Sequence, residues 1–382
     1  MINDTDGRIF ANNQNLKEVY LPDGMSQLGQ AAFENCTGLT TVVFGEGGMD
    51  GMTMESNPLY WSLFPGCTNL QTVDLSRTDL RKVGPSMFEN LMNLTTAELP
   101  DTVTAVEDDA FLFCESLKKV DISNVQSIGY RSFMGCDNLE SISPTGELPQ
   151  IRWIGEAAFA RCKSLSGSLI FGPDLSGIGK GAVNATQLTV IDMSQVKNVN
   201  IEIGAFSGND YLERFILPMN GENLSYMLDG CDIDCLVLPD GADPRFWYSF
   251  SASRIGVLIC EGSVPSERAR KGFAGDYPIV VPVDSVDAYK AAWPEYAHRI
   301  VAAELLVKPL ESDFGSFYEG KTICIMERGN EKCQPKNENT QRRRVTMRLS
   351  RRGQCGWSPS RGGPAGRWPR NSASASTRCA AG

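Results

Sequence analysis

The sequence has little or nothing of several features that mark common classes of protein. It contains one histidine, His298, in 382 residues, which argues against histidine-dependent triads, histidine-rich zinc sites and most histidine acid–base chemistry. No run of about twenty apolar residues occurs, so we expect no membrane-spanning helix. The start, MINDTDGRIF, has no basic segment followed by an apolar one, so we expect no signal peptide there. The composition is that of an ordinary soluble globular protein.

Acidic residues are absent from one part of the chain. Residues 341–382 contain ten arginines and no lysine, aspartate or glutamate. Residues 1–340 hold the other 26 basic residues and all 46 acidic ones, so their formal net charge is −20 and that of the tail is +10. An acidic body repels phosphate backbones, so nucleic acid could be bound only through the tail.

A repeated motif, Phe-x-x-Cys-x-x-Leu, organises the body. Its complete copies are Phe33/Cys36/Leu39, Phe64/Cys67/Leu70, Phe111/Cys114/Leu117, Phe133/Cys136/Leu139 and Phe159/Cys162/Leu165. Each leucine opens a Leu-x-x-Val-x-Leu/Ile stretch, and an apolar residue followed by glycine precedes the next phenylalanine. The opening leucines recur at a period near 23 residues, which is typical of leucine-rich repeats that each add one strand to a stacked parallel sheet. Longer spacings predict insertions at 45–60, next to Trp61, and around 143–150.

The alternation within each stretch predicts which side chains enter the core. The fourth and sixth residues share one face of the strand, and the third and fifth residues share the other. Inward apolar side chains then stack on their equivalents one coil along, while the phenylalanine of each unit fills the core from the opposite wall.

Twelve cysteines are present, but their positions indicate neither required disulfides nor metal. Six of them share one repeat position, namely Cys36, Cys67, Cys114, Cys136, Cys162 and Cys231. We expect these to be small buried side chains, since Asn13, Leu91 and Asn209 fill the same position elsewhere, although the spacing of neighbouring coils would permit a disulfide. The register sends Cys231 inward and Cys235 outward, so this pair is not a metal site. Asp4–Gly7 lacks the further ligands of a calcium loop. We expect no metal and no cofactor.

The pattern resembles the BspA-like leucine-rich repeats of bacterial surface proteins, also described as the Treponema pallidum type. The resemblance covers about residues 8–305. It implies a β-rich solenoid with a parallel concave sheet and short helical or irregular convex segments. It also implies a non-catalytic protein-binding or adhesive surface at the cell surface or in a secreted protein, and supplies no catalytic residue. Phe10 and Leu16 lie in the second half of a repeat, so we expect the chain to begin inside the solenoid.

The C-terminal side divides into three parts. We expect the solenoid to occupy residues 1–305 and to end in a strand–helix cap at about 279–305, with Ser285 as N-cap and Asp287 in the first helical turn. The helix would cover the edge and core of the last coil. We expect residues 306–340 to be a linker and residues 341–382 an arginine-rich disordered tail. The abrupt change in composition suits an out-of-frame or non-native extension, and a nucleic-acid-binding arm is the alternative.

The outward fifth positions of the strands are the candidate binding surface, because stacking aligns them into a stripe on the concave face. They include Asp74, Glu98, Asp121, Leu169, Asp192, Ile216, Val237 and Ile259. We expect a host or bacterial surface protein to bind there, with Asp74, Glu98 and Asp121 steering a basic segment and the last three apolar residues giving contact area. Solvated or cap-covered strand residues would show the same pattern, so that alternative stays open. An intracellular scaffold whose tail binds nucleic acid is the alternative function, and a hydrolase is disfavoured.

Overall fold

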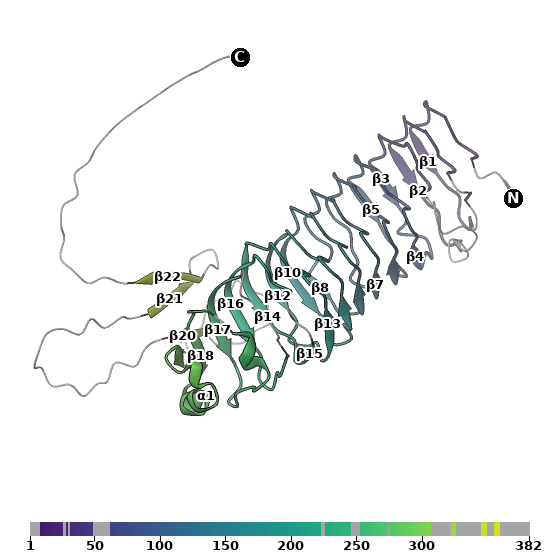
Figure 1. The fold of residues 1–382 in the computed structure, drawn as a ribbon. Coiled ribbons are helices and arrows are strands. Elements are labelled where there is room, and N and C mark those ends of the chain that lie inside the picture. The colour runs from purple at the N-terminus through teal and green to yellow at the C-terminus, as the bar shows by residue number, and fades with distance from the viewer. Residues whose placement is uncertain are drawn as a thin grey trace, which may run out of the picture.

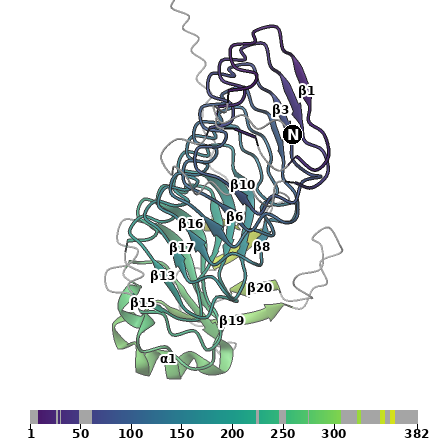
Figure 2. The same ribbon diagram turned by 90° about the vertical axis from the view of Figure 1, so that its right-hand side faces the viewer.

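The computed structural model describes residues 8–25, 28–29, 31–48, 62–222, 226–245, 253–273, 275–306, 322–325, 345–349 and 355–359. The insertion expected at 45–60 lies mostly outside these residues, as does the turn expected at 4–7. The described chain forms one elongated stack of coils with its N-terminal coils at one end and helix α1 (Val286–Ala292) at the other (Figures 1 and 2).

The first wall of the stack is built from the strands that follow the opening leucines. A four-stranded parallel sheet, in spatial order, contains β1 (Glu18–Tyr20), β2 (Thr41–Val43), β3 (Thr72–Asp74) and β5 (Thr96–Glu98). Isolated bridges from Thr96 to Lys119 and from Lys119 to Ser141 continue it. A second sheet then runs through β8 (Glu147–Leu148), β10 (Ser166–Phe171), β12 (Gln187–Asp192), β14 (Leu212–Ile216), β16 (Asp232–Leu238), β17 (Arg254–Cys260), β18 (Ile279–Pro282), β19 (Ile300–Leu306) and β20 (Thr322–Ile325).

The second wall is formed by short segments that contain the apolar residue next to each repeat glycine. Where short helical or irregular segments were expected, the structure has a seven-stranded parallel sheet of very short strands. In spatial order these are β4 (Lys82–Val83), β6 (Ala105–Val106), β7 (Ser127–Ile128), β9 (Trp153–Ile154), β11 (Gly177–Ile178), β13 (Val199–Ile201) and β15 (Gly221–Glu222). At Gly129, Gly155 and Gly179 a Cβ atom would overlap the backbone of the preceding coil, so glycine lets neighbouring coils approach closely at this corner.

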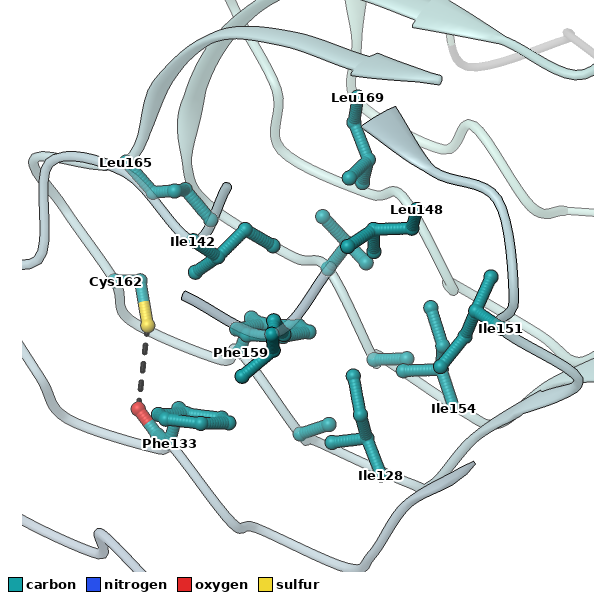
Figure 3. Packing of buried hydrophobic residues seen from close by; sticks show 14 of the residues in the cluster. Ile128, Phe133, Ile142, Leu148, Ile151, Ile154, Phe159, Cys162, Leu165 and Leu169 are labelled. Atoms are coloured by element: carbon teal, nitrogen blue, oxygen red, sulfur yellow. Dashed lines mark hydrogen bonds between the residues drawn. The ribbon is translucent and has the colours of Figure 1, made fainter. Parts of the chain in front are cut away.

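The core between the walls is the stack of repeated side chains that the sequence predicts. Seven phenylalanine rings, from Phe10 to Phe159, stack with centroids 4.9–6.1 Å apart and planes within 25° of parallel. Figure 3 shows Phe133 and Phe159 in this stack, with Ile128 and Ile154 closing the core on the second wall. One coil could not bury these rings alone, so the core exists only in the stack.

The six repeat cysteines are buried and free in the described residues. Each thiol lies against the carbonyl of the phenylalanine one coil earlier, as between Cys162 Sγ and Phe133 O at 3.2 Å (Figure 3). Asn209 replaces the cysteine in one coil and donates its amide to Val183 O and Phe206 O at 2.8 and 2.6 Å. The cysteines are therefore small core residues, each with a weak hydrogen bond.

The turns that carry the phenylalanines have an unusual backbone. The residues two before and two after the phenylalanine have positive φ, as at Arg131 (48°) and Gly135 (75°) around Phe133. The N–H groups of these three residues donate to carbonyls of Glu156, Ala158 and Ala160 in the next coil at 2.8–3.0 Å. The same pattern, with donors always facing the C-terminal neighbour, recurs around Phe33, Phe88 and Phe111.

The C-terminal end has the expected strand and helix, β18 and α1, and a further strand after them. Helix α1 buries Tyr289 and Trp293, whose hydroxyl and indole N–H donate to Gly262 O and Ser266 O, so it covers the core of the last coils. It does not end the sheet, because β19 follows it and pairs in parallel with β18. Ser285 holds the N-cap position without a capping bond of its side chain, since the 3-10 turn Val283–Ser285 runs directly into the helix.

The spans expected as linker and tail are described only in part, and only as backbone. In the linker, β20 pairs antiparallel with β19. In the tail, β21 (Val345–Leu349) and β22 (Cys355–Pro359) pair antiparallel with each other. The other tail residues lie outside the described part, and their lack of regular structure stays a prediction. Among the described residues, no helix is long and apolar enough to cross a bilayer.

Candidate binding surface on the strand face

The outward side chains of the first wall form a surface that we call the strand face. Its N-terminal part is aligned by the sheet register, which places Tyr20, Val43, Asp74 and Glu98 opposite one another on successive strands. The bridge from Thr96 to Lys119 puts Asp121 next along the same line. Glu98 and Asp121 are exposed and Asp74 is half-buried, so the expected acidic stripe exists as a row of neighbouring carboxylates.

Three aspartates of the strand face, Asp74, Asp121 and Asp192, also stabilise turns. Oδ1 of Asp74 accepts the backbone N–H of Ser76 at 2.9 Å and its hydroxyl at 2.6 Å. Asp121 holds Ser123 in the same way, and Asp192 accepts the N–H of Ser194 at 2.8 Å. This Asp-x-Ser turn ends the strand. One carboxylate oxygen of each aspartate thus accepts hydrogen bonds within the turn. The turn alone therefore accounts for an aspartate at this position, and no binding protein is needed to explain it.

The apolar part of the expected site is mostly not surface. Ile216 and Val237 are only 3% and 0% exposed, and Ile259 is half-buried. Near them the outward residues Cys235, Val257 and Val280 form a second apolar cluster, separate from the main core, against which Ile259, Val301 and Ala303 pack. Ile216 and Val237 therefore offer no contact area, as the alternative interpretation allowed for covered strand residues.

The position assigned to Leu169 was wrong, because a register shift between Gly167 and Ser168 turns the strand over. Leu169 enters the core at 1% exposure, and Ile170 pairs with Asp192 on the outward side. Sequence spacing alone does not predict this register shift, although Gly167, which is flanked by serines, was a signal for an irregular strand.

The strand face also contains residues that the fifth-position rule left out. The third positions point the same way as the fifth, and they align as Thr41, Thr72 and Thr96, with Lys119 and Ser141 bridged beyond them. The alternation of the strand could have identified this second row, which adds hydroxyls and one lysine beside the carboxylates.

The chemistry available to the described residues does not include a metal centre. No group of three or more potential metal-ligating side chains occurs among them. Cys231 belongs to the main core and Cys235 to the outward cluster, so the pair diverges as expected. Burial raises the pKa of Cys67 and of Cys231 to about 12, and it also raises the pKa of Cys114 and of Cys162 well above the ordinary value. These thiols are therefore protonated at neutral pH and poor nucleophiles. His298 is an exposed residue beyond α1.

Comparison with known proteins gives results for the family and for solved structures. The family described as BspA type Leucine rich repeat region matches in six copies, over residues 2–51, 57–152 and 146–254. No curated protein matches the chain.

Three solved structures to which this chain is similar are distant from it in sequence. A leucine-rich repeat protein from Bacteroides ovatus is 16% identical, with 76% of this chain and 85% of that one covered and a TM-score of 0.37. The Treponema pallidum leucine-rich repeat protein is 20% identical, with 50% and 76% covered and a TM-score of 0.34. A leucine-rich cell surface protein from Faecalibacterium prausnitzii is 16% identical, with 72% and 77% covered and a TM-score of 0.27.

The family match spans more than half of the residues, and it coincides with the stacked coils whose phenylalanines, cysteines and leucines were identified above. The chain belongs to the BspA-type leucine-rich repeat family.

Proposed function

We propose that the protein is a non-catalytic binding module of a bacterial surface or secreted protein, and that its strand face binds a basic segment of a protein partner. The bound surface comprises Asp74, Glu98 and Asp121 with the threonines beside them, and Asp192 and Ile259 lie further along the same face. Surface location follows from the family resemblance.

The observation that carries the proposal is the direct cross-strand pairing of Asp74 with Glu98. Like charges opposite each other on neighbouring strands destabilise a sheet. The turn to Ser76 accounts for Asp74, but nothing in the fold calls for a second carboxylate at Glu98. A cationic side chain of a partner would relieve this repulsion, which is the electrostatic complementarity that speeds encounter and selects partners.

The test removes the charges and keeps the turns. The triple variant Asp74→Asn, Glu98→Gln and Asp121→Asn retains amide oxygens that can accept from Ser76 and Ser123. We expect its affinity for a lysine-rich probe peptide to fall about tenfold at low salt, and the difference from wild type to shrink at 0.5 M salt because exposed charges are screened. The measurement is titration calorimetry on the full chain.

A matched control removes two aspartates and one glutamate elsewhere, by Asp101→Asn, Glu156→Gln and Asp174→Asn. All three are exposed, and they lie in turns outside the strand face. Equal weakening by both triples would mean that only net charge matters, and it would refute a site on the strand face.

The tail, in which all the charged side chains are arginines, favours a second candidate function, that of an intracellular scaffold that binds nucleic acid. Deletion of residues 341–382 would then abolish a strongly salt-dependent affinity for a single-stranded RNA probe, whereas a strand-face module would keep its affinity for the basic peptide.

A further inference from the structure

The second wall carries an exposed tryptophan beside a polar cleft, on a different face from the strand face. Trp153 lies on β9 and is 41% exposed. Its neighbour in register on β11 is Gly177, which in turn pairs with Asn200 on β13. A Cβ atom at Gly177 would overlap Cζ3 and Cε3 of the indole. The six-membered ring of Trp153 therefore lies over Gly177 and reaches toward Asn200.

A cleft on the second wall includes Ser176 and Asn200, the neighbours of Gly177 in the chain and in the sheet. It has a volume of about 320 Å³ and is lined mainly by Ser176, Asn198, Asn200, Asn220, Asp243 and Arg268. This volume is at the lower end of the range of about 300–1,000 Å³ for small-molecule sites. Trp153 is not itself a lining residue, but its indole lies over Gly177, which is next to Ser176 in the chain and to Asn200 in the sheet.

The charges of the cleft compensate each other. Arg268 Nε lies 3.3 Å from Asp243 Oδ2, and the hydroxyl of Ser266 donates to Oδ1 of the same aspartate. Asp243 and Arg268 are the charged side chains among the described residues that line the cleft, and they are paired with each other. Its recognition groups are the three asparagines, each of which offers a carbonyl acceptor and an NH₂ with two donors.

We propose that this cleft binds a neutral saccharide, one pyranose unit stacking on Trp153 and its hydroxyls bonding to Asn200 and Asn198. A pyranose ring has an apolar C–H face that suits an indole surface, which is large, rigid and amphipathic. A sugar hydroxyl both donates and accepts, as each asparagine amide does. A charged peptide would find no unpaired charge here, and an apolar ligand would leave the amides without partners, at a cost of about 1–3 kcal/mol each.

Gly177 determines where the indole of Trp153 lies. Any side chain there would displace the indole from the sheet surface, so glycine fixes the height of the ring relative to Asn200. The substitution Gly177→Ala keeps every proposed contact residue and changes only where the indole lies, which separates the position of the ring from its presence.

The test measures binding of three neutral hexasaccharides, cellohexaose, maltohexaose and chitohexaose, to the full chain by titration calorimetry. We expect at least one hexasaccharide to bind to the wild-type protein. Trp153→Ala and Asn200→Ala should each weaken that binding roughly tenfold or more. Trp153→Phe should retain part of the affinity, and Gly177→Ala should lower it. The control Tyr211→Ala removes another exposed aromatic residue, 61% exposed, and should have no effect. Circular dichroism confirms that each variant is folded.

The inference is overturned if none of the three hexasaccharides binds, or if Trp153→Ala binds as tightly as wild type. The Asp74→Asn, Glu98→Gln, Asp121→Asn triple is expected to bind the saccharide normally. If it too loses saccharide binding while folded, the ligand occupies the strand face and the cleft assignment is wrong.

Discussion

The N-terminal and C-terminal coils achieve the same stacking by different means. From Phe10 to Phe159 the strands of the first wall have at most three residues, except β10, and the phenylalanine rings form a continuous stack. From β12 on, the strands have five to seven residues in most coils, and Val183 and Leu228 replace phenylalanine. Side-chain stacking dominates the first region and the backbone ladder the second, so a repeat tolerates the loss of either one when the other is strong.

The two regions meet at a buried polar cluster. Asn209 Oδ1 accepts the backbone N–H and the hydroxyl of Thr186, and its amide nitrogen donates to Val183 O and Phe206 O. Both residues stand at the cysteine position of their coils. A fully bonded polar group fixes one arrangement of its neighbours, so this pair sets the register where the ring stack stops.

The largest effect should come from breaking the ring stack. We expect Phe111→Ala to lower the free energy of unfolding by about 3–5 kcal/mol, because it removes a fully buried ring from between Phe88 and Phe133. The equivalent change in the other region, Val183→Ala, should cost roughly half as much. Urea unfolding followed by circular dichroism measures both, and equal losses would show that the regions do not differ in this way.

A smaller loss is expected at the junction. Asn209→Ala should cost about 2–3 kcal/mol, since it leaves buried polar groups of Thr186, Val183 and Phe206 without partners. Asn209→Cys should recover part of this, because a thiol at this position can donate to the carbonyl one coil earlier, as Cys231 does to Phe206 O. If Asn209→Ala unfolds at the same urea concentration as wild type, the junction does not set the register.

Alkaline pH should weaken the stack through its buried repeat thiols. The pKa of Cys67 is about 12 in the folded chain, against an ordinary value of 9.0, so the folded protein holds this proton when the unfolded chain has lost it. The stability that this thiol contributes is fully present below about pH 9 and is lost as the pH rises toward 12, by about 1 kcal/mol per pH unit.

Urea midpoints at pH 8 and pH 10, with alkylation mapped by mass spectrometry, measure this dependence. The Cys67→Ala variant should show a smaller loss between the two pH values and serves as the control for lysine and tyrosine titration. Labelling of Cys67 at pH 8 without unfolding would contradict its burial.

The sequence predicted the features that depend on spacing within one coil. The phenylalanines, the six cysteines and the strands after Leu16, Leu70 and Leu212 lie where the repeat placed them. Each of these depends only on which face of a short strand a residue occupies. The family and the stacked architecture followed from the same pattern.

The features that the sequence did not predict depend on contacts between coils or on the residues that cover the face of a coil. The shift at Gly167 exchanged Leu169 for Ile170 on the outward side, the outward residue Val237 is fully buried, and β19 continues the sheet past the helix. The cleft beside Trp153 needs the register of three successive coils, and no spacing within one coil contains that information.

The hydrogen bonds between coils have opposite directions at the two corners of a coil. In a β-sheet the peptide dipoles alternate and largely cancel, but around Phe33, Phe88, Phe111 and Phe133 three N–H groups per coil all point toward the following coil. At the glycine corners the donors face the other way, since the N–H groups of Gly129 and Gly155 donate to Val106 O and Ile128 O of the preceding coil. Each coil therefore meets the coil that follows it with donors at the phenylalanine turn and with acceptors at the glycine corner, so its two faces are complementary and not alike.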